Sequence, residues 1–119
     1  MPTHPLGTLV TTLRRRPGVE AAIVLGPDGL VIAAEASSTV DVEALAAEAP
    51  RLVSRTVTVG AIAGRGTLQL AVLDLSEGGV IVSPLSPDAS LLLVTTPACD
   101  RAALVAELRR HRLHLEALA

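Results

Sequence analysis

Residues 18–34 constrain this chain most, because they form the pattern of two strands joined by one tight turn. Two apolar runs rich in β-branched residues, 19–25 and 30–34, flank Gly-Pro-Asp-Gly at 26–29. Proline fixes φ at the first central position of a turn, and aspartate and glycine suit the positions that follow. This pattern predicts a β-hairpin. Since only Glu20 interrupts the apolar runs, we expect both faces of the sheet to be covered.

The length of 119 residues predicts a single domain over residues 1–119, and the composition narrows the function of this domain. Half of the residues are hydrophobic, but Phe, Tyr and Trp are absent, so the core is built from aliphatic side chains. Single-stranded nucleic acids bind by stacking on aromatic rings, and a net charge of −2 does not attract phosphate backbones. We therefore expect no nucleic-acid partner. The single cysteine, Cys99, excludes an intrachain disulfide and a cysteine zinc cluster.

The N-terminus and the apolar runs indicate where the protein is located. Residues 1–5 lack the basic start and apolar run of a signal peptide. The longest apolar runs have about five residues, far fewer than a membrane-spanning helix needs. We expect a cytoplasmic protein without membrane insertion.

The first expected helix covers residues 6–13, where apolar residues recur at i, i+3, i+4 and i+7. Three arginines, 14–16, fall in its last turn, and Pro17-Gly18 ends it. Positive charge suits a helix C-terminus, so the triplet is either a solvated helix end or a patch for a partner or a phosphate.

A second helix is expected from Asp41 to Ala63, capped by Thr39 or Asp41. Pro50 should kink or break it, and the β-branched run 56–59 is also compatible with a strand. One side carries Val42, Leu45, Ala46, Ala49, Leu52, Val53, Thr56 and Gly60. A second side of small or polar residues, which allows close approach by another surface, carries Ala44, Ala47, Arg51, Ser54 and Thr58.

Three more strands and a helix complete the expected fold. The strands are 67–75, 80–84 and 90–95, and the last is central because residues 91–94 are all apolar. Thr96-Pro97 opens the final helix. Its inner stripe holds Leu104, Val105, Leu108, Leu115 and Leu118, and its outer face holds Arg101, Glu107, Arg109, Arg110 and Arg112. The fold class is α+β, an α/β sandwich: a five-stranded antiparallel sheet with helices on both faces in the order α-β-β-α-β-β-β-α.

This order resembles the Roadblock (dynein light chain) domain family, with its Roadblock/longin/profilin-like fold. The resemblance spans nearly the whole chain but rests on turn glycines and apolar strands, not on catalytic groups. The matching positions are Pro17-Gly18-Val19, Ala22, Asp28-Gly29, Ala33, the long helix after Asp41, Gly79 to Pro84, and Leu91 to Val94.

The resemblance implies a homodimer in which the third strand pairs with its twin and the central helices pack together. The residues themselves agree in part, because the strand 67–73 contains no proline and no charge and would invite pairing if left exposed. The implied interface comprises Leu45, Ala49, Leu52, Val53, Thr56, Thr67, Leu68, Gln69, Leu70, Ala71, Val72 and Leu73.

The resemblance also implies a role in regulation. Bacterial relatives of the MglB type bind a small Ras-like GTPase and help it to hydrolyse GTP, and eukaryotic relatives act as adaptors. The implied partner surface is Ala44, Ala47, Arg51, Ser54 and Arg55. The alternative is an assembly module for a sensor kinase or a polarity complex, with no link to a GTPase.

The sequence offers no catalytic, cofactor or metal site. The glycine-rich segment 60–66 lacks the lysine of a phosphate-binding loop. His111 and His114 could reach one metal ion but have no further ligand nearby. Cys99 near a helix start could have a lowered pKa. Arg51 and Arg65 are candidates for arginines that stabilise a GTPase transition state, although a solvated loop arginine is the commoner case.

Overall fold

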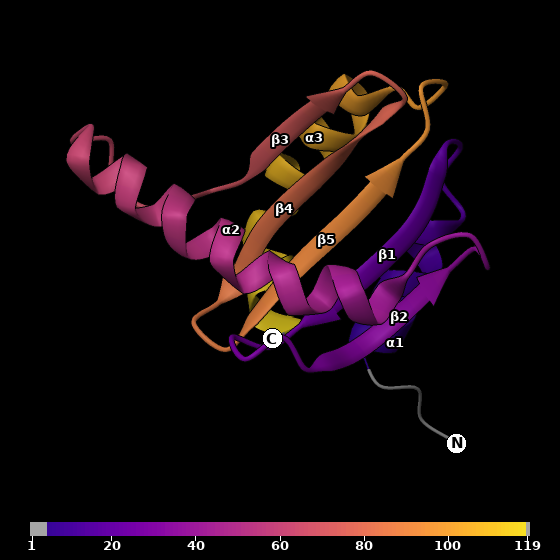
Figure 1. Ribbon diagram of the computed structural model, residues 1–119, viewed down its shortest axis with the longest axis horizontal. Helices are drawn as coiled ribbons and strands as arrows, with labels where there is room; N and C mark the ends of the chain where they lie inside the picture. Colours follow the sequence, from indigo (N-terminus) through magenta and orange to yellow (C-terminus); the bar gives the residue numbers. More distant parts are fainter. Residues whose placement is uncertain (1–4, 119) are drawn as a thin grey trace.

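Five antiparallel strands form one sheet in the computed structural model, which describes residues 5–118 (Figure 1). The strands lie in the order β2-β1-β5-β4-β3, so β5 is central, as its apolar run predicted. The elements are α1 (Pro5–Arg14), β1 (Val19–Leu25), β2 (Val31–Ala36), α2 (Val42–Ile62), β3 (Ala71–Leu75), β4 (Gly78–Ser86), β5 (Ala89–Thr95), α3 (Arg101–Arg110) and α4 (Arg112–Leu118).

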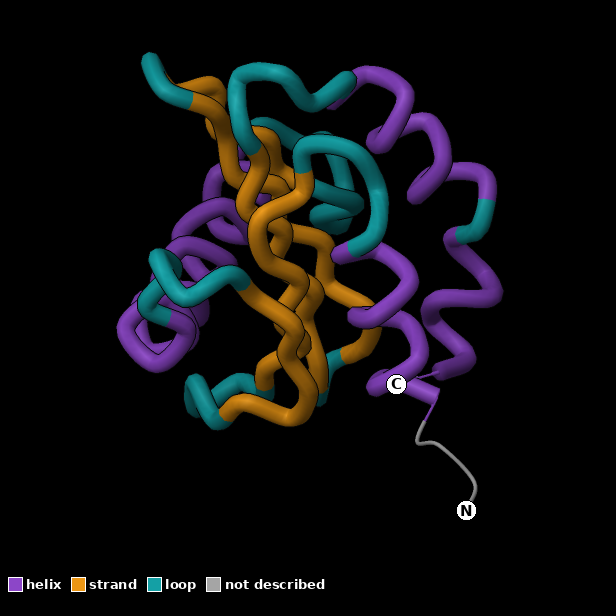
Figure 2. Tube along the Cα trace, turned by 90° about the vertical axis from the view of Figure 1, so that its right-hand side faces the viewer, coloured by secondary structure: helices purple, strands orange, loops and turns teal. Residues whose placement is uncertain are grey.

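Helices cover both faces of the sheet, which confirms the predicted fold class (Figure 2). On one face, α1, α3 and α4 pack against the strands around buried residues such as Leu91 and Leu93. On the other face, α2 packs through Ala46 and Ala49 against residues that include Ile23. In the part of the chain that the structure describes, no helix is both long and apolar enough to cross a membrane.

The predicted hairpin is present, but its two strands differ in burial. Every residue of β1 except Glu20 is buried. β2 contains only exposed and half-buried residues, and Ile32 is 46% exposed. Helices cover both faces of the sheet, as expected, but β2 is less buried than β1. The reason is its position at the edge of the sheet, where it has a neighbouring strand on one side only.

One continuous α2 runs through Pro50, so the predicted break is absent. Its N-cap is Asp41, whose side chain accepts a hydrogen bond from the amide of Ala44. The β-branched run after it is helical rather than extended. There the hydroxyls of Thr56 and Thr58 donate to carbonyls one turn earlier, as threonines in helices commonly do.

β3 begins at Ala71 rather than at the predicted Thr67. Ala71 pairs with Val82 in an unshifted antiparallel register, so an extended strand would place Gln69 opposite Pro84. Proline has no amide hydrogen to donate to a neighbouring strand. The carbonyl of Gln69 instead accepts hydrogen bonds from the Ser83 hydroxyl and the Arg112 guanidinium. Side-chain hydrogen bonds therefore replace the backbone hydrogen bonds between the two strands at this point.

The C-terminal region corrects three further predictions. Helix α3 begins at Arg101 with Asp100 as its N-cap, whereas Thr96 and Pro97 belong to a preceding turn. The single expected helix is two helices, which meet at His111. The predicted inner leucines 104, 108 and 115 are buried. Arg112, which was expected to face outward, reaches the sheet instead.

Candidate interaction surfaces

The predicted partner surface forms one exposed face of α2. All five of its residues, Ala44, Ala47, Arg51, Ser54 and Arg55, are exposed. They lie on the side of the helix opposite the buried Ala46 and Ala49, as their spacing requires. Among residues 5–118, neither Arg51 nor Arg55 makes an ion pair. The face thus combines a small-residue surface with two guanidinium groups available to a partner.

The helix residues of the predicted dimer interface lie nearer the sheet. Leu45, Leu52, Val53 and Thr56 are half-buried. Ala49 is 3% exposed and belongs to the core on this face of the sheet. In this chain the flank of α2 therefore offers partly exposed aliphatic side chains, and Ala49 packs within the chain itself.

The strand residues of the predicted interface divide into two groups. Ala71, Val72 and Leu73 belong to β3, at the edge of the sheet, whereas residues 67–70 form the irregular segment before it. Val72 is 43% exposed. Leu75 is 55% exposed at the end of the same strand and was not part of the predicted interface. The edge thus presents exposed apolar side chains at Val72 and Leu75, interrupted by the exposed carboxylate of Asp74.

The second half of α2 carries an apolar surface that the sequence analysis missed. Val57, Val59 and Ile62 are all exposed, Ile62 by 82%. Figure 1 shows this end of the helix extending past the strands near the start of β3. A cleft of about 900 Å³ lies beside it and is lined by residues that include Val53, Leu68 and Pro84. The available signal was the presence of large apolar residues off the inner stripe of the helix.

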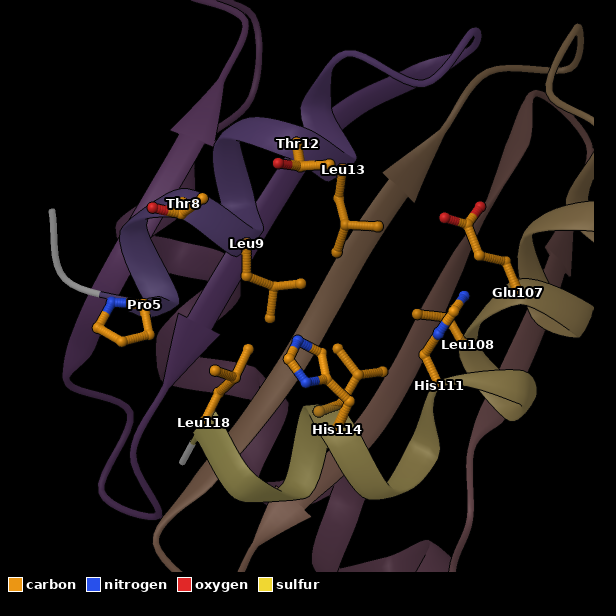
Figure 3. A pocket seen from close by; sticks show the side chains of 11 residues that line it. Pro5, Thr8, Leu9, Thr12, Leu13, Glu107, Leu108, His111, His114 and Leu118 are labelled. Atoms are coloured by element: carbon orange, nitrogen blue, oxygen red, sulfur yellow. The ribbon is translucent and has the colours of Figure 1, made fainter.

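A smaller cleft of about 380 Å³ lies between α1 and the C-terminal helices (Figure 3). Leu9 and Leu118 point into it from opposite sides, and His111 and His114 also line it. Within the described ranges, no group of three histidine, cysteine, aspartate or glutamate residues could hold a metal ion. The geometry therefore completes no metal site around the histidine pair.

The remaining candidates of the sequence analysis lie apart from these surfaces. Burial, and secondly the charge of Asp100, raises the pKa of the Cys99 thiol, so the predicted lowering is wrong. The thiol therefore stays protonated, and unreactive as a nucleophile, to a higher pH than an ordinary cysteine. Arg65 is exposed after the end of α2, and among residues 5–118 its guanidinium reaches only the carbonyl of Gly64.

The arginine triplet after α1 is used mainly within the chain. Arg14 donates to the carbonyl of Val19 at 2.8 Å, and Arg16 forms an ion pair with Glu107. Arg15 is exposed. The triplet therefore ties the end of α1 to β1 and to α3, which favours the helix-end interpretation over a phosphate patch.

An antiparallel sheet with β2 and β3 at its two edges, covered on both faces by helices of which one is long and amphipathic, defines an α+β sandwich domain. The model of the Roadblock/LC7 domain matches residues 6–95, so the chain belongs to the Roadblock/LC7 domain family, as the resemblance predicted.

Solved structures with the same fold include other members of this family. The Roadblock/LC7 domain from Streptomyces avermitilis is 23% identical with a TM-score of 0.75, over 92% of this chain and 96% of that one. Myxococcus xanthus MglB is 9% identical with a TM-score of 0.83, over 95% of this chain and 93% of that one. A structure of MglB with a tetrameric arrangement is 18% identical with a TM-score of 0.81, over 94% of this chain and 85% of that one. Comparison with curated protein sequences gave no match.

Proposed function

We propose that this chain is a single-domain, non-catalytic adaptor of the cytoplasm that forms a homodimer and binds a small Ras-like GTPase. The observation that carries the proposal is the exposed face of α2, where Arg51 and Arg55 have no intramolecular ion pair among the described residues. Guanidinium groups in this state are suited to carboxylates and phosphates on a partner.

Self-association is supported by the β3 edge and the neighbouring end of α2. An edge strand has unpaired backbone groups that a second strand can satisfy. Val72 and Leu75 on β3 and Val59 and Ile62 on α2 add exposed apolar area. Pairing of two β3 strands would extend the sheet across the dimer and bury part of this area, which is favourable.

The role we assign to the dimer is recognition rather than chemistry. Ala44 and Ala47 have side chains short enough to allow a partner close to the helix backbone, and Arg51 and Arg55 add positive charge on the same face. Catalysis would belong to the GTPase. The dimer would favour one nucleotide state of it through a difference in affinity between the two states.

The test is a capture experiment with a matched control. The double variant Ala47→Glu, Arg51→Glu places two negative charges one helical turn apart on the proposed surface. The control Ala106→Glu, Arg110→Glu makes the same two changes, at the same spacing, on exposed positions of α3. The probe is a small Ras-like GTPase of the same organism, loaded with a GTP analogue or with GDP.

We expect the α2 variant to lose at least about tenfold in affinity for one nucleotide state, since reversing an interface charge weakens association on this scale. The control should bind like the unmodified chain. Equal binding by all three proteins would contradict the assignment of this surface.

The second candidate function is an assembly module for a sensor kinase or a polarity complex. It is supported by the apolar cleft beside α2, which offers a docking surface that does not depend on Arg51 or Arg55. Failure of the unmodified chain to bind the GTPase in either nucleotide state, together with co-purification of a kinase, would favour this candidate.

A further inference from the structure

Two arginines connect the C-terminal helices to the β3 edge. Arg101 is the first residue of α3 and Arg112 is the first residue of α4. Their side chains are only 27% and 21% exposed. Both reach carbonyl groups in or next to β3, at Leu73 and at Gln69. Both arginines were expected on the outer face of the final helix, so these contacts give them a different role.

Arg112 makes the denser set of contacts. One guanidinium nitrogen, Nη1, donates to the Gln69 carbonyl at 2.5 Å and to the Ser83 hydroxyl at 3.0 Å. The other, Nη2, donates to the Pro84 carbonyl at 3.0 Å, and Nε donates to Glu116 at 2.8 Å. A planar group with five donors can satisfy such an arrangement, whereas an ammonium group cannot reproduce its geometry.

Arg101 holds the strand itself. Its Nη2 pairs with Asp74 at 2.6 Å, and its Nη1 lies 3.4 Å from the Leu73 carbonyl. Asp74 is the only charged residue of β3. Its exposed carboxylate is partly neutralised by this pair, so it opposes the approach of a second strand less than a free aspartate would.

Arg112 acts where the backbone ladder between β3 and β4 is missing. Since Pro84 has no amide to offer Gln69, the segment before β3 is held by the hydroxyl of Ser83 and by Arg112. Ser83 is 2% exposed, so water does not readily replace a lost partner. Removing the guanidinium would therefore loosen residues 67–70 and the beginning of β3.

We propose that the C-terminal helices shape the association edge through Arg101 and Arg112, so that self-association depends on the docking of α3 and α4. The proposal rests on the proposed homodimer. Both arginines lie beyond residues 6–95, the part of the chain that the family model matches. They act as positioning residues, because they hold the edge that a second copy would contact.

The test uses three variants of the full chain. Arg112→Ala removes the guanidinium, Arg112→Lys keeps the charge without the planar fork, and Arg110→Ala removes an exposed arginine two residues away. Hydrogen exchange of the amides of residues 69–73 reports the edge directly. Sedimentation velocity over a range of concentrations gives the dissociation constant of the dimer.

We expect Arg112→Ala to exchange these amides about tenfold faster and to dimerise about tenfold more weakly, because a buried acceptor loses a charged donor. Arg112→Lys should fall between this variant and the unmodified chain, and Arg110→Ala should match the unmodified chain. If Arg112→Ala fails to fold, the lysine variant still provides the comparison.

The outcomes separate this proposal from the proposed function. If the unmodified chain is a monomer, the proposed homodimer is wrong. The exchange rates then decide the positioning role of Arg112: faster exchange in Arg112→Ala supports it, and unchanged exchange overturns it. If the chain dimerises and both arginine-112 variants leave the exchange rates and the dissociation constant unchanged, the positioning role is overturned.

Discussion

The two edges of the sheet present nearly equal apolar exposure but differ in how well they could accept another strand. Ile32 on β2 is 46% exposed and Val72 on β3 is 43% exposed. The pairing of β2 with β1 contains a register shift near Ile32, whereas β3 pairs with β4 without one. β2 also carries Glu35, which accepts a hydrogen bond from Thr11 of α1, the helix packed on this strand.

This contrast teaches that exposure of a side chain does not by itself identify an association edge. An irregular register and a charged side chain both discourage pairing with another chain. β2 has both features. β3 has a regular backbone, and its one charge is paired with Arg101. The backbone and the charges therefore support the proposal that β3, rather than β2, is the association edge.

The largest expected effect comes from placing a lysine on each edge in turn. Val72→Lys would place an ammonium group of each copy in the partly desolvated interface of a β3–β3 pairing. We expect dimerisation to weaken by about 4 kcal/mol, or roughly 1,000-fold. Ile32→Lys, at a position of similar exposure, should leave the mass in solution unchanged.

Sedimentation velocity of the two lysine variants provides the measurement, and circular dichroism confirms that both are folded. Loss of the dimer in the Ile32 variant but not in the Val72 variant would reverse the assignment of the two edges.

A smaller effect is expected from the turn that leads into β2. Gly29 has φ +85°, and a β-carbon added there would lie 2.7 Å from the carbonyl oxygen of Ala46 in α2. Gly29→Ala should therefore cost about 3 kcal/mol of unfolding free energy, from backbone strain and overpacking together. Chemical denaturation would measure it.

Gly64→Ala is the matched control, because Gly64 also has positive φ but none of the residues that the structure describes, its chain neighbours aside, lies within 4 Å of the added carbon. Strain alone should cost about 1 kcal/mol there. Equal losses at the two positions would show that α2 does not constrain the turn.

The smallest effect is expected from removing the charge on β2. Glu35→Thr should change the unfolding free energy by no more than about 0.5 kcal/mol, as is usual for an exposed site. The mass in solution should not change, because the register shift and α1 remain. Appearance of larger species in light scattering would show that the carboxylate alone keeps this edge unpaired.

Local patterns in the sequence predicted most of the fold. The turn at 26–29, the apolar run 91–94 and the helical spacing after Asp41 each depend on neighbouring residues, and each prediction is confirmed. The start of β3 was misplaced because Pro84 acts on Gln69 from another strand, through a register that the sequence does not reveal.

The candidate surfaces were also predictable only where they depend on residues that are near one another in the sequence. The exposed face of α2 follows from helical periodicity, so its five residues do lie together. Arg101 and Arg112 resemble ordinary surface arginines in the sequence, because their contacts at Asp74 and Pro84 lie more than twenty residues away. The pKa of Cys99 depends on burial, which a position near a helix start does not indicate.

The extension of α2 past the strands has a consequence for the dynamics of the free chain. Its last turns lack the packing that supports Ala46 and Ala49, and short helical segments without such support are only marginally stable in water. These turns should therefore open and close far more often than the first half of the helix. Association would restrain this motion, so the conformational entropy lost would offset part of the favourable free energy of association.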